Sequence, residues 1–440
     1  MPAPNDVHRT LDRYQLVDGY DLVLDLDGSH GTWIRDARSG DEFLDAFTCF
    51  ASWPIGYNHP RLMEADFVEE LARCARHKPA NSDLYTQEMA AFVESFATNV
   101  TPDGYPYHFW VSGGALAVEN ALKVAFDWKA RKLGRTSFTD NVNDLVILHF
   151  DRAFHGRSGY TLSLTNTIPD KVGLFPKFDW PRVHAPALRF DLDGNPSGDV
   201  EAEEARAVQE IEAAFTRHRG KVAAIIIEPM QGEGGDNHFR PEFLRRLRAY
   251  ADAEESLLVF DEVQTGFFGS GAPWLWQKKD AAPDVVAFGK KTQVCGIYAN
   301  RRVEEVEDHV FARSSRINST WGGNLVDMVR CRRIIDVVLE ESLPEHITAM
   351  GDRCLAGLRA VARETNAFDN VRGEGSLIAF TFETKEMRDR MLSVLYEKRV
   401  IALACGPDSV RFRLPLNIQP GEVDTLLERV AMSVPAAVGA

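Results

Sequence analysis

Residues 257–290 begin with Leu257-Leu-Val-Phe-Asp261 and end with Asp284-Val-Val-Ala-Phe-Gly-Lys290, two apolar runs that each finish in a charged residue. Both runs are rich in Val, Leu and Phe and are too short for helices, which favours buried β-strands. Similar runs lie at residues 107–111, 145–150 and 222–228. Between the runs, apolar residues recur at helical spacing over residues 117–133, 201–219 and 241–255. This alternation predicts an α/β fold with a mainly parallel sheet covered by helices on both faces.

The character of the chain changes after about residue 325. Two long helical patterns, at residues 324–341 and 344–365, precede a series of short strands and helices, and the first sixty residues are β-like and rich in turns. We therefore expect residues 66–325 to form a large domain. Residues 1–65 and 326–440 would then form a smaller α+β domain that is built from both ends of the chain.

Composition narrows the class of protein. The 440 residues carry a net charge of −15, which disfavours nucleic acid and anionic membranes as partners. An apolar stretch of about 18 residues, which a membrane span needs, is missing. The first thirty residues lack the apolar core of a signal peptide, so we expect a cytoplasmic protein. The six cysteines form no CxxC pair, and we expect neither a disulfide scaffold nor a metal site.

Ligands of such a sheet bind beyond the carboxyl ends of the strands, so the polar residues that follow each apolar run are the candidates for chemistry. Ser112-Gly-Gly-Ala115 suits a phosphate at a helix start, or is a plain tight turn. Ala153-Phe-His-Gly-Arg157 offers an aromatic face and a cation, or is a polar loop with one buried Phe. Each pattern alone leaves both interpretations open.

The two runs that open and close residues 257–290 supply charged candidates. Asp261 can bind Mg²⁺ or pair with a protonated ring nitrogen, but the GxxxxGK[ST] motif that accompanies Mg²⁺ in P-loop ATPases is missing. Lys290 at a buried strand end can form a Schiff base with an aldehyde cofactor, or can extend its amine to the surface.

Together these motifs resemble the class III aminotransferases of fold type I, which use pyridoxal 5'-phosphate. The matching residues are Phe260-Asp-Glu-Val-Gln-Thr-Gly266, Pro283-Asp284 and Phe288-Gly-Lys290. The spacing of 29 residues between Asp261 and Lys290 is typical of the family and selects Lys290 over Lys291 as the Schiff-base lysine.

The resemblance implies roles for other cofactor-binding residues. Asp261 would pair with the pyridine nitrogen, Gln264 with the ring hydroxyl, and Phe154 would stack on the ring. Gly114 and Ala115 match the phosphate turn, although the family usually has Ser-Gly-Thr there.

A further matching segment lies at Asn318-Ser-Thr-Trp-Gly-Gly-Asn324. It resembles the segment whose Thr, here Thr320, binds the phosphate in the neighbouring subunit. This match implies a homodimer with shared active sites, and Asn318 is a further candidate for substrate binding.

Within the family the chain is most similar to enzymes that act on lysine, through Phe288-Gly-Lys-Lys-Thr-Gln-Val-Cys-Gly296 and Phe154-His-Gly-Arg-Ser-Gly-Tyr-Thr-Leu-Ser163. Many family members instead carry a run of glycines after the lysine. The resemblance implies ping-pong transfer of the terminal amine of L-lysine to 2-oxoglutarate, which yields 2-aminoadipate 6-semialdehyde and L-glutamate. The alternative is another ω-aminotransferase that acts on ornithine, 4-aminobutyrate or a diamine.

Two substrates with differently placed carboxylates need two cationic partners. Arg157 is our candidate for the α-carboxylate of lysine, because a guanidinium binds a carboxylate through two hydrogen bonds. Arg411, in Arg411-Phe-Arg-Leu-Pro-Leu416, matches the family arginine that binds the keto acid. We expect Glu233, which follows a predicted strand, to pair with Arg411 while lysine is bound and to swing away for the keto acid.

Overall fold

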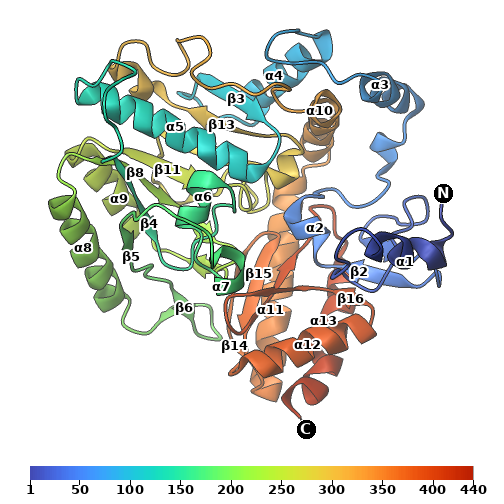
Figure 1. Cartoon of the computed structure of the whole chain (residues 1–440). Coiled ribbons are helices and arrows are strands. Elements are labelled where there is room, and N and C mark those ends of the chain that lie inside the picture. The colour runs from blue at the N-terminus through green and yellow to red at the C-terminus, as the bar shows by residue number, and fades with distance from the viewer. Residues whose placement is uncertain (440) are drawn as a thin grey trace.

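A seven-stranded sheet forms the centre of the computed structural model, which describes residues 1–439. Its strands lie in the order β3 (Tyr107–Val111), β13 (Cys295–Ala299), β12 (Val285–Phe288), β11 (Leu257–Asp261), β8 (Val222–Ile227), β4 (Val146–Phe150) and β5 (Arg182–Val183). Strand β13 is antiparallel to both of its neighbours, β3 and β12, and all other neighbouring strands in this sheet pair parallel. The mainly parallel sheet expected from the sequence is thus confirmed (Figure 1).

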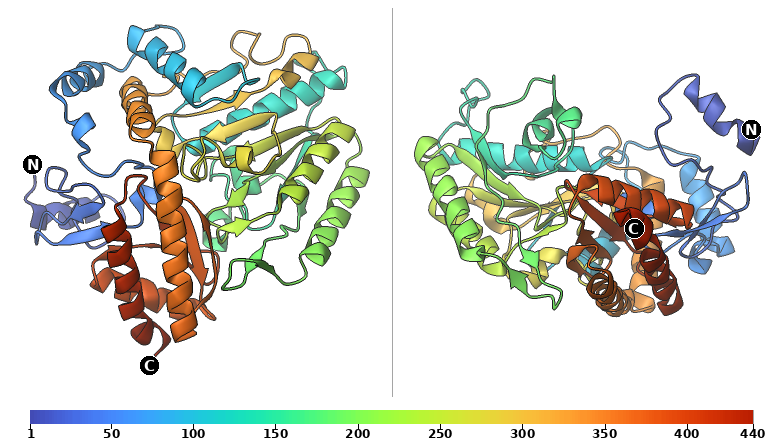
Figure 2. Two further views of the ribbon diagram at one scale, coloured as in Figure 1. Left: turned by 180° about the vertical axis from the view of Figure 1, so that it is seen from behind. Right: turned by 90° about the horizontal axis from the view of Figure 1, so that it is seen from below.

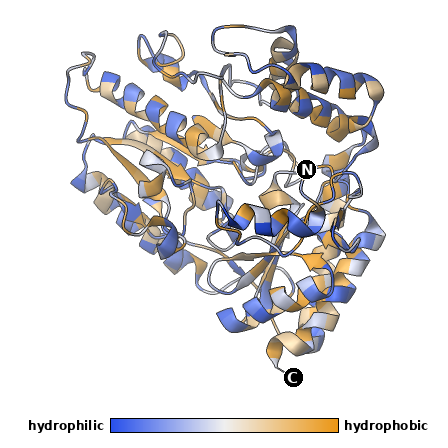
Figure 3. Ribbon diagram, turned by 45° about the vertical axis from the view of Figure 1, so that its right-hand side comes forward, coloured by the Kyte–Doolittle hydropathy of each residue, from blue (hydrophilic) through white to orange (hydrophobic). Residues whose placement is uncertain are grey.

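Helices cover both faces of this sheet (Figure 2). The three long ones are α5 (Gly114–Lys132), α8 (Val200–Arg217) and α9 (Pro241–Ala253), close to the predicted ranges. On β8, Ile225 packs in the same apolar cluster as Phe243 of α9, whereas the next residue, Ile226, packs in the same cluster as Leu122 of α5. The strand is therefore apolar along its whole length because each face meets a helix. Figure 3 shows the central strands as largely hydrophobic.

The last third of the chain forms a second, antiparallel sheet with three helices against it. The strands lie in the order β14 (Asp369–Glu374), β15 (Leu377–Thr381), β18 (Ser409–Arg413) and β17 (Leu403–Cys405). The helices are α11 (Leu343–Thr365), α12 (Lys385–Glu397) and α13 (Pro420–Val438). Apolar residues of this sheet and of α11 and α13 join the main hydrophobic core.

The two ends of the chain meet in a small three-stranded sheet. It consists of β1 (Trp33–Arg35), β2 (Glu42–Asp45) and β16 (Val400–Ile401), and β16 pairs parallel to β2 with Val400 opposite Leu44. Further along, α3 (Ala65–Ala75) and α4 (Gln87–Asn99) contact α10 (Leu325–Glu340). Our division of the chain at residues 65 and 325 remains a proposal.

The remaining elements are short. They are α1 (Val7–Asp12), α6 (Gly159–Leu164), α7 (Pro169–Val172), β6 (Arg189–Phe190), β7 (Pro196–Ser197), β9 (Met230–Gln231) and β10 (Asn237–His238), with 3₁₀ turns at Pro4–Asp6, Pro60–Leu62, Leu275–Lys278, Lys290–Thr292 and Arg301–Glu305. Within residues 1–439, no helix is long and apolar enough to cross a membrane.

The segment labelled α2 (Thr48–Ala51) has an unusual backbone. All four of its residues have positive φ angles, between 44° and 68°. Residues other than glycine disfavour this left-handed conformation. The sequence contains no glycine at residues 48–51 that would predict it. The turn is anchored by Asp45 at the end of β2, whose Oδ1 accepts hydrogen bonds from the backbone N–H groups of Phe47 and Thr48 at 2.8 and 2.7 Å.

The central sheet should dominate the stability of the chain. Leu258 on β11 is fully buried, so Leu258→Ala leaves a cavity between sheet and helices and should lower the free energy of unfolding by about 2–5 kcal/mol. Leu339 on α10 is 43% exposed, and Leu339→Ala, the matched control, should change it by less than about 0.5 kcal/mol. Urea unfolding of both cofactor-free variants measures the difference. Equal effects would contradict this assignment of the core.

Candidate functional site

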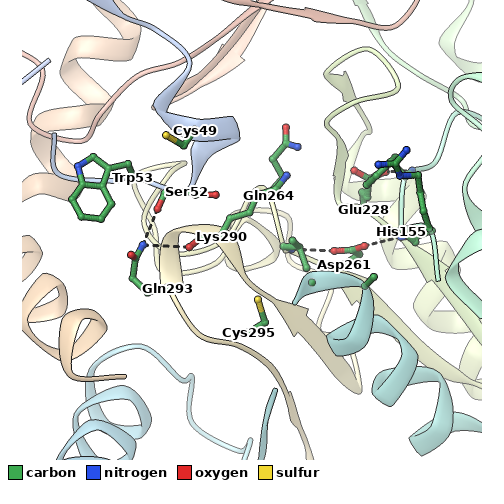
Figure 4. Close-up of a pocket in the computed structure, with 16 residues that line it drawn as sticks. Cys49, Ser52, Trp53, His155, Glu228, Asp261, Gln264, Lys290, Gln293 and Cys295 are labelled. Atoms are coloured by element: carbon green, nitrogen blue, oxygen red, sulfur yellow. Dashed lines mark hydrogen bonds and ion pairs between the residues drawn. The ribbon is translucent and has the colours of Figure 1, made fainter. Parts of the chain in front are cut away.

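A cavity of about 570 Å³ opens beyond the carboxyl ends of the parallel strands (Figure 4). Its walls come from the segments that follow β3, β4, β8, β11 and β12, which is the position expected for a ligand of this fold. Residues 49–53 close another side. Seven of the predicted site residues line the cavity: Gly114, Ala115, Phe154, Arg157, Asp261, Gln264 and Lys290.

Asp261 is held by a histidine whose role the sequence did not reveal. Nδ1 of His155 lies 2.8 Å from Oδ2 of Asp261, and the backbone N–H of Val263 donates to Oδ1 at 3.0 Å. Both side chains are buried, at 2% and 5% exposure. The two residues are 106 positions apart, so only the fold joins them. The carboxylate is therefore fixed at the cavity wall, where it suits a cationic ring nitrogen.

Glu228, which follows β8, is a second buried carboxyl that the sequence did not single out. Its oxygens accept hydrogen bonds from the backbone N–H groups of Phe154 at 2.9 Å and Gly232 at 3.0 Å. Burial raises the pKa of this carboxyl to about 7. Glu228 thereby fixes the loop that carries Phe154 and His155 at the cavity.

Lys290 lies two residues after the end of β12 and lines the cavity, with a left-handed φ of 56°. Its pKa falls to about 8, first because burial disfavours the charged amine and then because Arg411 and Arg413 repel it. The neighbouring Lys291 lies away from the cavity lining, is buried, and donates its Nζ to the carbonyl of Gln264 at 2.6 Å. The geometry therefore separates the two lysines as the spacing in the sequence did.

The start of α5 gives the cavity a turn that is suited to an anion. Gly113, with a φ of 110°, precedes the helix, and Gly114 and Ala115 begin it. Backbone N–H groups at a helix start lack acceptors within the helix and carry its positive dipole end. Gly156 approaches this turn so closely that a Cβ there would lie 2.6 Å from Cβ of Ala115. The turn thus requires glycine in the facing loop.

Gln264 connects the cavity to two buried arginines. Its Oε1 accepts hydrogen bonds from Nη1 of Arg411 at 2.9 Å and from Nη2 of Arg413 at 2.6 Å. Arg413 also forms a buried ion pair with Asp236, at 2.6 Å. Because the amide oxygen faces the arginines, the amide nitrogen of Gln264 is left as a donor for the cavity.

Glu233, which we expect to pair with Arg411 while lysine is bound, contacts other partners in this structure. Oε1 of Glu233 accepts hydrogen bonds from the hydroxyl of Thr167 at 2.6 Å and from Nζ of Lys171 at 2.7 Å. Lys171 lies on α7, a four-residue helix that the sequence did not predict. Arg411 instead contacts Gln264, and within the described chain its Nε has no hydrogen-bond partner.

Asn318 and Thr320 lie in the exposed loop before α10, outside the lining of this cavity. Oδ1 of Asn318 accepts a local hydrogen bond from the N–H of Ser319 at 2.7 Å, and the neighbouring Trp321 is 46% exposed. Arg411 is also absent from the cavity lining and lies behind Gln264.

The cavity fits pyridoxal phosphate by the chemistry of its donors. Lys290 supplies an amine for the aldehyde, and the fixed Asp261 supplies a carboxylate for the ring nitrogen. Gln264 supplies a donor for the ring hydroxyl, the start of α5 supplies N–H groups for the phosphate, and Phe154 supplies an aromatic face.

Comparison with known proteins gives a consistent result. A family model described as aminotransferase class-III matches residues 16–434. The L-lysine-epsilon aminotransferase of Mycobacterium tuberculosis is 48% identical over 98% of this chain and 96% of its own length. A solved structure of lysine aminotransferase from M. tuberculosis covers 99% of this chain and 100% of its own, with a TM-score of 0.94 and 46% identity. A 4-aminobutyrate aminotransferase of Schizosaccharomyces pombe is 30% identical over 96% of this chain and 91% of its own length.

The lowered pKa of Lys290 predicts its reactivity. An amine reacts when neutral, so modification of Lys290 in the cofactor-free protein by a small amine-reactive reagent should reach half its maximal rate near pH 8. A lysine in water would reach it only near pH ~10.4. Peptide mass spectrometry across a pH series measures the rate, and buried Lys291 serves as the unreactive control. A rate for Lys290 that still climbs steeply above pH 10 would contradict the assigned environment.

Proposed function

The chain belongs to the class III aminotransferases, and from this premise we propose that it is a pyridoxal-phosphate-dependent L-lysine 6-aminotransferase. It would transfer the terminal amine of L-lysine to 2-oxoglutarate in a ping-pong cycle. The products would be 2-aminoadipate 6-semialdehyde and L-glutamate. The observation that carries this proposal is the 48% identity to L-lysine-epsilon aminotransferases over nearly the full chain, against 30% for a 4-aminobutyrate aminotransferase.

When bound, pyridoxal phosphate supplies an aldehyde that exchanges amines and a ring that withdraws electrons. Asp261, oriented by His155, would keep a proton on the ring nitrogen. With a pKa of about 8, the free amine of Lys290 would be suited to take a proton from the substrate carbon that bears the reacting amine. The same Nζ would then carry that proton and give it back during the transfer.

Two arginines at different depths serve the two substrates. Arg157 lies at the exposed side of the cavity, where a lysine bound by its terminal amine would place its distant α-carboxylate. Arg411 lies deeper, behind Gln264, and its charge would attract the α-carboxylate of the keto acid. Burial and the neighbouring Arg413 lower the pKa of Arg411. An anionic ligand would therefore be favourable here, because it reduces the repulsion between the two adjacent cations.

The active enzyme would be a cytoplasmic homodimer with shared active sites. In this arrangement Thr320 contacts the phosphate bound by the partner subunit, and Asn318 lies beside its substrate. The exposure of both residues, outside the cavity of their own chain, supports this assignment.

The first test uses L-lysine labelled with ¹⁵N only at its terminal amine, incubated with 2-oxoglutarate and cofactor. Mass spectrometry should find the label in glutamate, because the cofactor held at Lys290 would take up the terminal amine of lysine and pass it to 2-oxoglutarate. Unlabelled glutamate would mean transfer of the α-amine and would require new roles for Arg157 and Arg411. If lysine yields no glutamate while ornithine or 4-aminobutyrate does, the chain is a different ω-aminotransferase.

The two arginines should separate the two half-reactions. Arg157→Gln removes the partner of the lysine carboxylate and should raise KM for lysine roughly 10- to 100-fold, with little effect on KM for 2-oxoglutarate. Arg411→Gln should show the reverse. Steady-state kinetics with each substrate varied in turn measures both constants. Arg353→Gln, which removes a surface pair with Asp424, is the control. Equal effects on both substrates would contradict the division of roles.

A further inference from the structure

Gln293 has a strained backbone three residues after Lys290. Its φ of 61° and ψ of −48°, together with the hydrogen bond from the N–H of Val294 to the carbonyl of Thr292 at 2.6 Å, form a γ-turn with positive φ. This turn is rare for any residue other than glycine. Strained backbone of this kind persists where the surroundings hold it, and such places cluster at functional sites.

The side chain of Gln293 forms hydrogen bonds that fix the strained turn in place. Its Nε2 donates to the carbonyl of Ser52 at 2.7 Å and lies within 3.2 and 3.4 Å of the carbonyls of Lys291 and Lys290 (Figure 4). Its Oε1 accepts a long hydrogen bond from Arg330 at 3.4 Å. The amide thus joins the loop of the reactive lysine to a segment 241 residues earlier in the chain.

The segment that Gln293 binds is itself strained. It is the left-handed turn Thr48–Ala51, which brings Cys49, Ser52 and Trp53 to the cavity wall. Directly after this turn, the N–H groups of Ser52 and Trp53 both donate to the carbonyl of Thr48, at 2.7 and 3.0 Å. Asp45 anchors the beginning of the turn, and Gln293 anchors its end.

We propose that Gln293 is a positioning residue that fastens this cavity wall to the Lys290 loop. The inference rests on the proposed function in one respect, the role of Lys290 as the reactive lysine. A glycine would adopt the same backbone without strain. The presence of glutamine at this strained position is explained if its amide is needed to hold Ser52 and the backbone of Lys290 in fixed positions relative to each other.

Two variants separate the amide from the backbone. Gln293→Gly relieves the strain but removes the side chain, whereas Gln293→Glu keeps the shape and replaces the donor with a carboxylate that faces three carbonyl oxygens. Asn366→Gly is the matched control, because Asn366 also has a left-handed φ, of 51°, but lies at the exposed end of α11.

The first measurement is hydrogen exchange of the peptide that covers residues 46–54 in the cofactor-free protein. Loss of the anchor should expose the N–H groups of Ser52 and Trp53, so both Gln293 variants should exchange roughly tenfold faster there than the wild type. Asn366→Gly should match the wild type. Unchanged exchange in either Gln293 variant would overturn the proposal, and this result does not depend on which amino donor the enzyme uses.

The second measurement uses the loaded enzyme. Both Gln293 variants should lower kcat/KM for the amino donor roughly 10- to 100-fold and shift the pH at which the visible absorbance of the bound cofactor titrates, because the backbone of Lys290 moves. If Gln293→Gly keeps the wild-type kinetics and titration, the side chain is a spacer and the proposal is wrong. If the wild-type enzyme uses another amino donor, the proposed substrate is wrong. The differences between the wild type and the Gln293 variants would still be expected with that donor.

Discussion

The parallel pairing of β11 with β12 is the constraint on which the site depends. Asp261 lies opposite Ala287 in this register, so Lys290 leaves the sheet at the same edge three residues later. The carboxyl ends of parallel strands lie at the same edge of the sheet. Asp261 and Lys290, which are far apart in the chain, can therefore face one cavity. A shift of β12 by one residue would turn its side chains to the other face of the sheet and separate the amine from the carboxylate.

The buried charges around this edge differ in how they are paired. Asp261 is hydrogen-bonded to His155, and Asp236 neutralises Arg413. Arg411 donates to the neutral amide oxygen of Gln264 and has no carboxylate partner within the described residues. Burial first, and then the positive charge of Arg411 and Arg413, lower the pKa of Lys290. The same positive charge is available to an anionic substrate. The cavity therefore combines a reactive neutral amine with attraction for carboxylates, and the same arginines contribute to both properties.

Much of this arrangement follows from local features of the sequence. Continuous apolar runs mark the strands because both faces are covered, and the residues after the runs mark the site, which is why Asp261 and Lys290 were predicted. The contacts between distant loops were not predictable in this way. His155 meets Asp261 only through the fold, and Glu233 finds Lys171 on a helix too short to show a period. The left-handed turn at Thr48–Ala51 carries no glycine that would signal it.

The pairing of β2 with β16 affects folding during translation. Leu44 emerges from the ribosome long before Val400, so β2 lacks this neighbouring strand until residue 400 has been synthesised. The cavity wall that begins just after β2 therefore cannot take its final form until β16 has emerged. Contacts this distant in sequence form late and slowly. The nascent chain is therefore expected to fold its central sheet before this wall of the site takes its final form.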